Sequence, residues 1–343
     1  MENLISNWCN TVKSLPQEYI FPEDTRPGDK IVPNFENCPI IDLEKADSGD
    51  RNDVIQQILQ ASQDCGLFQV INHGISEDLL KDTMGLEKEF FNLPNEDKAS
   101  LYSLDPSKSC RLYSSSFDYA GETVHRWRDV LKHNAHPLEE WVDLWPQKPS
   151  KYRDVVGKYS VELRNLSLRI LEMIREGLEL NPGYFGDELT GAQALLLNHY
   201  PPCPEPSLAL GISKHCDPNI ITILYQEDVG GLQVMKDGQW VEVEPVPNAL
   251  VVLIGHLLKV VSNGKLESAE HRAVTNAKES RYTIGSSINP RSKDVVIEPA
   301  KALLEKHDCR PLYRAFTYKD YHQVYKEKRG EGEPTLEVFK IEG

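Results

Sequence analysis

Long apolar runs and glycine-rich phosphate loops are both missing from this 343-residue sequence. No stretch reaches the roughly 18 to 20 uninterrupted apolar residues that a membrane-spanning helix needs, so no membrane partner is expected. The first residues, MENLISNWCNTVKSLPQEY, lack the basic head and apolar core of a secretory signal. The patterns GxGxxG and GxxxxGK[S/T] do not occur, which removes the usual evidence for nucleotide-dependent chemistry.

Cysteine and positive charge are also scarce. The seven cysteines form an odd set without a CxxC pair, which argues against a disulfide framework and predicts a reducing, cytoplasmic location. Lysine and arginine number 38 against 53 acidic residues, so the formal net charge is −15. Phosphate backbones and anionic membranes repel such a charge, and nucleic acid is therefore not an expected partner. We expect a monomer that acts on a small molecule.

The first half of the chain mixes strand and helix patterns. Residues 1–36 are polar and dotted with prolines, which predicts an extended lead-in. Within the following region, 37–190, CPIIDL and GLFQVINHG have strand patterns, and the spacing of apolar residues predicts three helices. The expected helices cover 51–66, about 76–91 and 150–180. A stretch from about 103 to 122, with SSS and DP, predicts a loop.

Residues 191–300 change to short β-patterned runs with no helix expected between them. Turn residues separate the runs ALLLNHY, NIITILYQ, GLQVMKDGQWVEVEPV, ALVVLIG, HRAVTN and RYTIGSSI. This pattern predicts a double-sheet jelly roll, also called a double-stranded β-helix. The expected fold class is mainly β with α: a jelly-roll core at 191–300, flanked by the helices of 37–190 and followed by a helical tail at 301–343. No linker separates these regions, so we expect one shared core.

His215 and Asp217 stand one residue apart just before the run NIITILYQ. On a strand, two such side chains project from the same face and can supply adjacent ligands to a metal. His271, which opens HRAVTN, can supply a third ligand from another strand. Two histidines and one carboxylate are the facial set that holds non-haem Fe(II) in oxygenases, whereas catalytic zinc prefers near-tetrahedral sites. The HxD pattern alone also fits turn capping beside a packed histidine.

Arg281 and Thr283 share one strand face in RYTIGSS. A guanidinium and a hydroxyl that point together form a fork for a carboxylate. A metal face near such a fork is what an enzyme needs to chelate a 2-oxo acid, with the keto-acid end on the metal and the distal carboxylate on the arginine.

These motifs resemble those of the plant-type 2-oxoglutarate- and Fe(II)-dependent dioxygenases, from about Pro39 to about Phe316. The resemblance includes CPIIDL, FQVINHG, NHYPPCPEP, HCDPNIITILYQ, GLQV…GQW and SNG…S..HRAV in the family's order. Within the family, WRDVLKHNAHPLEEW and ILEMIREGLELNPGYF are most similar to hyoscyamine 6β-hydroxylase-like enzymes and next to salicylate 5-hydroxylase-like ones. The resemblance implies that His215, Asp217 and His271 are the catalytic iron ligands. It also implies dioxygen as a reactant and ascorbate as a reductant.

For the co-substrate, the resemblance implies that Arg281 forms a salt bridge to the distal carboxylate of 2-oxoglutarate. Thr283 replaces the family's usual serine and keeps its hydroxyl group. Asn198 and Tyr200 match the N-x-Y positions, which also contact the co-substrate.

Three positions depart from the family pattern. His256 stands where an aspartate is common, and Lys214 precedes the first ligand where an uncharged residue is usual. Ser287 stands where an aromatic or aliphatic side chain often lines the substrate pocket. These departures concern the substrate rather than the metal chemistry, and Lys214 and Ser287 are candidate substrate contacts.

Three further candidate substrate contacts, Phe117, Tyr119 and Lys132, lie in the region that caps the active site in related enzymes. The resemblance implies hydroxylation of a small plant specialised metabolite, with epoxidation, desaturation or demethylation as other outcomes. A tropane-type alkaloid is favoured, and its cationic amine would need either an aromatic cage or a carboxylate, which Asp118 or Glu122 could supply.

Three alternatives remain open at this point. If Lys214 faces the metal and neither Asp118 nor Glu122 does, a phenolic acid such as salicylate fits better than a cationic amine. An iron oxidase that uses ascorbate without a keto acid is a second alternative. A non-catalytic metabolite-binding relative is the third.

Overall fold

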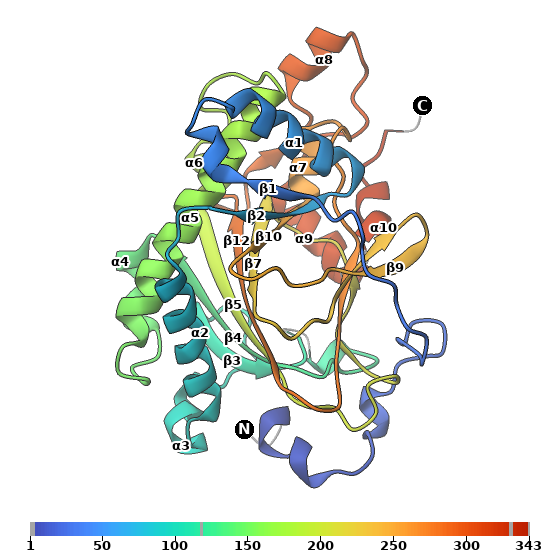
Figure 1. The fold of residues 1–343 in the computed structure, drawn as a ribbon. Helices are drawn as coiled ribbons and strands as arrows, with labels where there is room; N and C mark the ends of the chain where they lie inside the picture. The colour runs from blue at the N-terminus through green and yellow to red at the C-terminus, as the bar shows by residue number, and fades with distance from the viewer. Residues whose placement is uncertain (1–3, 117–118, 329–331, 342–343) are drawn as a thin grey trace.

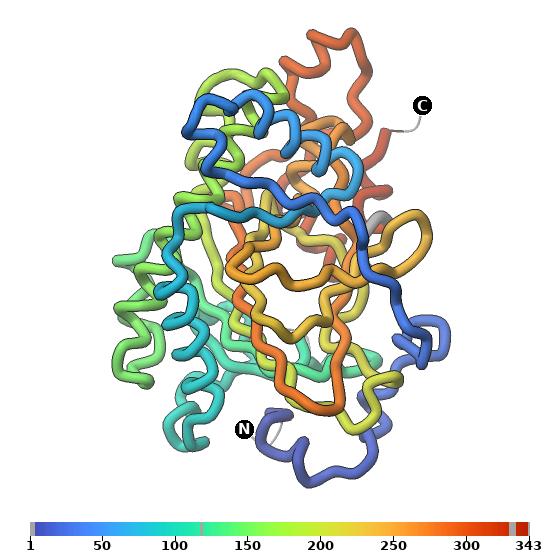
Figure 2. Tube along the Cα trace, viewed as in Figure 1, coloured from blue at the N-terminus to red at the C-terminus, as the bar shows by residue number. Residues whose placement is uncertain are grey.

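Two β-sheets form the centre of the molecule, and helices cover the outer face of the larger one (Figure 1). The computed structural model describes residues 4–116, 119–328 and 332–341, and Figure 2 traces the chain through them. The larger sheet contains, in spatial order, β1 (Ile40–Asp42), β2 (Leu67–Ile71), β10 (Leu250–Ile254), β7 (Ile221–Gln226), β12 (Arg281–Asn289), β5 (Ala192–Tyr200), β4 (Asp129–His136) and β3 (Cys110–Ser114). The smaller sheet contains β6 (Leu210–His215), β11 (His271–Val274), β8 (Leu232–Lys236) and β9 (Gln239–Glu242). This arrangement confirms the predicted jelly-roll class with flanking helices.

The alternation of side chains on β5 and β12 gives the larger sheet two different faces. Leu197 and its cross-strand partner Ile284 are fully buried in the main core beneath the helices. The next pair along, Asn198 and Thr283, projects the other way into a cavity between the sheets. Because successive side chains of a strand point to opposite faces, one face of this sheet forms part of the apolar core and the other forms the polar wall of the cavity.

The three predicted long helices are present. They are α1 (Arg51–Asp64), α2 (Glu77–Asn92) and α5 (Tyr152–Gly177). The hydroxyl of Ser76 accepts a hydrogen bond from the Leu79 amide and caps the start of α2. The shorter helices are α3 (Asn95–Lys98), α4 (Leu138–Trp141), α6 (Asp187–Thr190), α7 (His256–Val261), α8 (Lys301–His307), α9 (Tyr318–Glu327) and α10 (Gly332–Glu337). None of the helices in the described ranges has the length and apolar character needed to cross a bilayer.

Two local predictions are wrong. The expected loop at 103–122 contains β3, which pairs with β4 and extends the larger sheet. Its sequence, CRLYS, is too short for a strand period to stand out beside the turn residues that follow it, and all five residues pair with β4. The expected helix-free region also contains α7, a six-residue helix between β10 and β11. Its run HLLKVV is too short for periodicity to distinguish a helix from a strand.

The N-terminal segment packs against the body instead of extending freely. It forms three 3-10 turns, Ile5–Asn7, Cys9–Thr11 and Gln17–Tyr19, and runs along the lower edge and then up one side (Figure 2). The rings of Trp8 and Tyr19 each lie 5.3 Å from Trp127, edge to face. The main core draws residues from all three regions 37–190, 191–300 and 301–343, and the division at these boundaries stays a prediction.

Candidate metal centre and cavity

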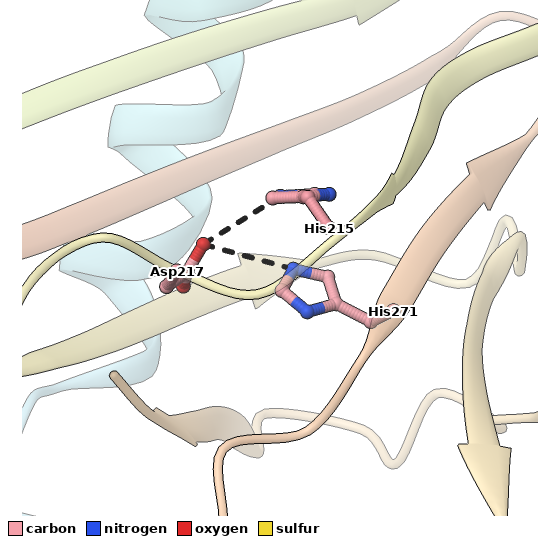
Figure 3. Close-up of side chains that lie close together, drawn as sticks. All are labelled: His215, Asp217 and His271. Carbon is pink, nitrogen blue, oxygen red and sulfur yellow. Dashed lines mark ion pairs between the residues drawn. The ribbon is translucent and has the colours of Figure 1, made fainter. Parts of the chain in front are cut away.

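Three side chains, His215, Asp217 and His271, meet between the two sheets (Figure 3). His215 ends β6 and His271 begins β11, and these two residues are cross-strand partners. Asp217 lies just beyond β6, in the turn that leads to β7, so only one member of the HxD pair is on a strand. Oδ1 of Asp217 lies 3.6 Å from Nε2 of His215 and 3.8 Å from Nε2 of His271.

Both histidines are oriented by backbone carbonyl groups. Nδ1 of His215 lies 3.0 Å from the Ser213 carbonyl oxygen, and Nδ1 of His271 lies 3.0 Å from that of Ala269. A carbonyl oxygen can only accept, so each Nδ1 carries the proton and donates it. In a neutral imidazole this leaves Nε2 with a free lone pair, which is the state a metal ligand needs.

The charges at this site favour a cation. Burial, followed by the neighbouring His215, lowers the pKa of His271 to about 4, so its ring is neutral at pH 7. Burial opposes ionisation of Asp217, but its interactions with His215 and then with His271 outweigh burial and hold the pKa of Asp217 below its ordinary value. The site therefore contains a carboxylate at Asp217 and a neutral imidazole at His271.

These donors fit one divalent ion. The three ligand atoms lie within 4.8 Å of one another. Metal bonds of about 2.0–2.2 Å allow two ligand atoms up to about 4 Å apart to share an ion, and both distances to Asp217 satisfy this limit. Two histidine nitrogens and one carboxylate oxygen are also the donor set typical of non-haem Fe(II).

The four expected co-substrate residues lie side by side on β5 and β12. Arg281 pairs with Tyr200, and Thr283 pairs with Asn198. Thr283, Tyr200 and Asn198 line the cavity. Arg281 is 2% exposed and lies just beneath this wall, with its guanidinium 5.1 Å from the centre of the Tyr200 ring.

Two polar residues that the sequence did not point to hold this group in place. Nη2 of Arg281 donates to Oε1 of Gln226 at 3.0 Å. Nη1 of Arg128 donates to Oδ1 of Asn198 at 3.0 Å, and the Asn198 amide donates to Oγ1 of Thr283 at 3.3 Å. Both residues lie within recognised motifs, but only the pairing of strands shows what they contact.

The cavity has a volume of about 1900 Å³ and is bounded by both sheets and by α9. Small-molecule sites commonly occupy about 300–1,000 Å³, so this space is large enough for a co-substrate and a second organic molecule together. Among the candidate substrate contacts, Lys132, Lys214 and Ser287 line it. Tyr119 is not part of the lining and stacks on His125 at 3.8 Å between ring centres. Phe117 lies outside the described residues.

The two acids considered as partners for a cationic substrate do not offer a free carboxylate in the described structure. Glu122 lines the cavity, but its oxygens are bound by Arg126 at 2.7 Å, by His125 at 2.9 Å and by the hydroxyl of Ser115. Asp118 lies outside the described residues. Lys214 is half-exposed, and its Nζ lies 3.8 Å from Oε1 of Glu270.

His256 has a structural partner that the sequence could not indicate. Its ring is fully buried at the start of α7, and Nδ1 lies 2.7 Å from the hydroxyl of Tyr321 on α9. Burial, followed by Lys259, lowers the pKa of His256 to about 3, so the ring is neutral. The backbone amide of His256 also donates to the carbonyl of Asp217 at 2.9 Å and so supports the turn that carries this acid.

Comparison with known proteins gives consistent results along the chain. A family model of the 2OG-Fe(II) oxygenase superfamily matches residues 191–290, and a model of the N-terminal region of non-haem dioxygenases in morphine synthesis matches residues 38–148. Hyoscyamine 6-dioxygenase of Hyoscyamus niger is 42% identical, with 99% of each chain covered. Flavanone 3-dioxygenase 2 of Oryza sativa subsp. japonica is 41% identical, covering 95% of this chain and 94% of the relative. A crystal structure of JOX2 in complex with 2OG, Fe and JA is 32% identical with a TM-score of 0.86, covering 99% and 98% of the two chains.

Proposed function

Since the chain belongs to the 2OG-Fe(II) oxygenase superfamily, we propose that His215, Asp217 and His271 bind its Fe(II) ion and that the cavity beside them holds 2-oxoglutarate and a small organic substrate. The protein is an oxidoreductase of the dioxygenase type, so the ascorbate-only oxidase and the non-catalytic relative are not retained. The observation that carries the proposed ligand set is the approach of three ligand atoms to within 4.8 Å.

The proposed roles follow from the contacts of each residue. When bound, Fe(II) with 2-oxoglutarate and dioxygen supplies the oxidative decarboxylation that releases succinate and carbon dioxide and provides one oxygen atom to the substrate. The carbonyl groups beside Nδ1 of His215 and His271 orient both rings and leave Nε2 of each neutral ring free to bind the metal. Asp217 supplies the negative charge.

For the co-substrate, we propose that Arg281 neutralises the distal carboxylate and that the Thr283 hydroxyl donates to it. The buried position of Arg281 supports this role, because a charge pair strengthens in a site that excludes water. Asn198 and Tyr200 complete this wall of the cavity, and Arg128 fixes the amide of Asn198.

Anaerobic titration tests the proposed roles separately. Fe(II) and 2-oxoglutarate together should give a weak visible charge-transfer band, from which the affinity for each can be measured. Arg281→Ala should weaken 2-oxoglutarate binding by about 10- to 100-fold, the effect of losing hydrogen bonds to a charged group. Binding of Fe(II) should change little, and Arg281→Lys, which keeps the charge but not the fork, should be intermediate. Equal losses for metal and co-substrate would contradict the assigned fork.

Two substrate classes follow from different observations. The 42% identity to hyoscyamine 6-dioxygenase favours a tropane-type alkaloid. The basic residues of the cavity favour an anionic metabolite such as a phenolic acid. A screen of tropane alkaloids, indoles and hydroxybenzoates for substrate-stimulated succinate release separates these classes and also reveals whether hydroxylation, epoxidation, desaturation or demethylation follows.

A cytoplasmic monomer with ascorbate as reductant remains part of the proposal. All seven cysteines are free thiols, which suits a reducing compartment. The strongly negative net charge argues against nucleic acid and anionic membranes as partners.

A further inference from the structure

Two basic side chains face each other across neighbouring strands of the cavity wall. Arg111 on β3 and Lys132 on β4 are direct cross-strand partners, and both line the cavity. Like charges placed directly opposite on an antiparallel pair destabilise a sheet. The pair therefore costs stability unless an anion lies between the two groups.

Arg111 has donor atoms that no described residue satisfies. It is 2% exposed, and neither its Nε nor its Nη1 has a hydrogen-bond partner among the described residues. Its guanidinium lies 4.5 Å from the centre of the Tyr113 ring, which fixes its position without neutralising its charge. A buried N–H group without an acceptor is costly, because it has lost its water and gained no hydrogen bond.

The ammonium group of Lys132 also lacks a partner in the described part of the chain that would neutralise its positive charge. It is half-buried, and no hydrogen bond or ion pair joins it to the residues that the structure describes. Burial, followed by the charges of Arg111 and Lys293, lowers the pKa of Lys132 to about 8. Burial, followed by Lys293 and Lys132, also lowers the pKa of His322 to about 4, so positive charge dominates this side of the cavity.

The acids of the cavity wall are bound to other basic residues or exposed to solvent, and outside the wall the exposed Asp105 interacts electrostatically with Arg111. Asp187 is bound to Arg291 at 2.6 Å, and Glu122 and Glu270 also have basic partners of their own. The two remaining acids of the described lining outside the metal site, Asp24 and Glu140, are exposed to solvent.

We propose that Arg111 and Lys132 together bind the carboxylate of the primary substrate, which makes that substrate a small organic acid rather than a cationic amine. The proposal rests on the proposed dioxygenase function and names the substrate class of the same cavity. A guanidinium can donate hydrogen bonds to both oxygens of a carboxylate, and the ammonium can donate to one of them from the neighbouring strand.

The position of the pair separates it from the co-substrate residues. Lys132 is the cross-strand partner of Leu196 on β5, and Leu196 is in turn the partner of Gly285 on β12. Two strand spacings separate Lys132 from β12, or roughly 10 Å. The carboxylate of the substrate and the distal carboxylate of 2-oxoglutarate would therefore occupy different places, and the pair lines the same cavity as the three candidate metal ligands.

The test measures binding without turnover. Anaerobic protein loaded with Fe(II) and 2-oxoglutarate is titrated calorimetrically with salicylate and a panel of small aromatic and aliphatic carboxylates, each beside its methyl ester and its corresponding amine. We expect at least one carboxylate to bind about 10-fold more tightly than its ester and its amine, because both analogues lack the charge that the pair recognises. Arg111→Met and Lys132→Met should each weaken that carboxylate by about 10- to 100-fold.

Matched variants distinguish the pair from a general effect of charge. Lys319→Met removes a cation from the exposed rim of the same cavity and should leave carboxylate binding unchanged. Lys132→Arg should keep most of the affinity, and 2-oxoglutarate binding should be unaltered in Arg111→Met. Should Arg111→Met fail to fold, Arg111→Lys and Lys132→Met carry the test.

The proposal is overturned if no carboxylate is preferred to its ester and amine, or if Arg111→Met and Lys132→Met bind it as the wild type does. Carboxylate binding that depends on both residues, but without succinate release when dioxygen is admitted, would support this inference and contradict the proposed function.

Discussion

At the scale of single residues, the most unusual acid is Glu87 on α2. Its side chain is fully buried, and neither carboxylate oxygen has a hydrogen-bond partner within the described structure. Burial, followed by the nearby charge of Glu227, raises the pKa of Glu87 well above its ordinary value of 4.5. The folded protein therefore holds Glu87 as a neutral acid at pH values where the unfolded chain has already lost that proton.

This difference predicts that stability falls as pH rises. Above pH 4.5 the unfolded chain releases the proton of Glu87 while the folded protein keeps it, so each step toward higher pH favours unfolding until the folded pKa is passed. Glu87→Gln carries no such proton. We expect the melting temperature of the wild type to fall relative to Glu87→Gln between about pH 5 and pH 8.

The measurement is thermal unfolding over this pH range, with Glu89→Gln as control. Glu89 lies on the exposed side of the same helix, so its substitution should leave the pH dependence of the wild type unchanged. Parallel curves for the wild type and Glu87→Gln would show that the folded protein does not hold this proton.

Residues of the cavity differ in how far the sequence could predict them. His215, Asp217 and His271 were expected to meet because a metal requires specific donor types, and these three side chains do lie together. The proposed role of Arg111 could not be predicted in this way, because it depends on Lys132, which lies directly opposite on the next strand. The place of His256 likewise depends on Tyr321, 65 residues farther along the chain.

At the scale of elements, the N-terminal segment is joined to the sheet by one acid. Asp129 at the start of β4 is fully buried, and its carboxylate accepts hydrogen bonds from the amides of Ile5 and Ser6, each at 2.9 Å. The hydroxyl of Ser114 donates to the same carboxylate. The first 3-10 turn is thereby fixed beside the aromatic contacts of Trp127.

Asp129→Ala should release this segment. The amides of Ile5 and Ser6 lose their acceptor, and buried donors without acceptors cost about 1–3 kcal/mol. We expect faster hydrogen exchange at these two amides and a lower free energy of unfolding. Ser114→Ala removes one donor but keeps the carboxylate, so it should leave exchange at Ile5 and Ser6 close to that of the wild type. Unchanged exchange in Asp129→Ala would mean that the aromatic contacts alone hold the segment.

Elements were predictable where periodicity extended over several turns. Helices α1, α2 and α5 have repeated apolar spacing, and the sequence located each of them to within about three residues, the usual uncertainty of helix ends. Strand β3 and the three N-terminal 3-10 turns are short, and each is stabilised by partners distant in sequence. The local sequence pattern does not show which distant residues will pair with a short element, so these elements could not be predicted from it.

At the scale of the whole molecule, charge is distributed unevenly. The chain has a formal net charge of −15, yet the cavity wall places Arg111 and Lys293 close enough to Lys132 to contribute to its lowered pKa, after the larger effect of burial. The overall negative field disfavours polyanions at the surface, while the local positive field favours a small anion inside. Net charge therefore predicts which macromolecules are excluded but not which substrate is bound.

The candidate metal centre also joins the two sheets. His215 and His271 belong to β6 and β11 of the smaller sheet, whereas Asp217 lies on the segment that leads into β7 of the larger one. An ion held by all three side chains would connect the sheets at this point. Metal binding should accordingly stabilise the folded molecule and do so most strongly around these strands.

We expect Mn(II) with 2-oxoglutarate to raise the melting temperature, since a ligand at about 100 times its dissociation constant adds about 2.7 kcal/mol. Hydrogen exchange should slow mainly in β6, β11 and the start of β7, and much less in α1, which lies on the outer side of the larger sheet (Figure 1). Removal of the metal with a chelator should reverse both effects. His271→Ala should abolish them, because this substitution removes one of the two candidate ligands that the smaller sheet provides. Stabilisation of equal size in His271→Ala would place the ion elsewhere, and uniform slowing of exchange in α1 and β11 would argue against a connection localised between the sheets.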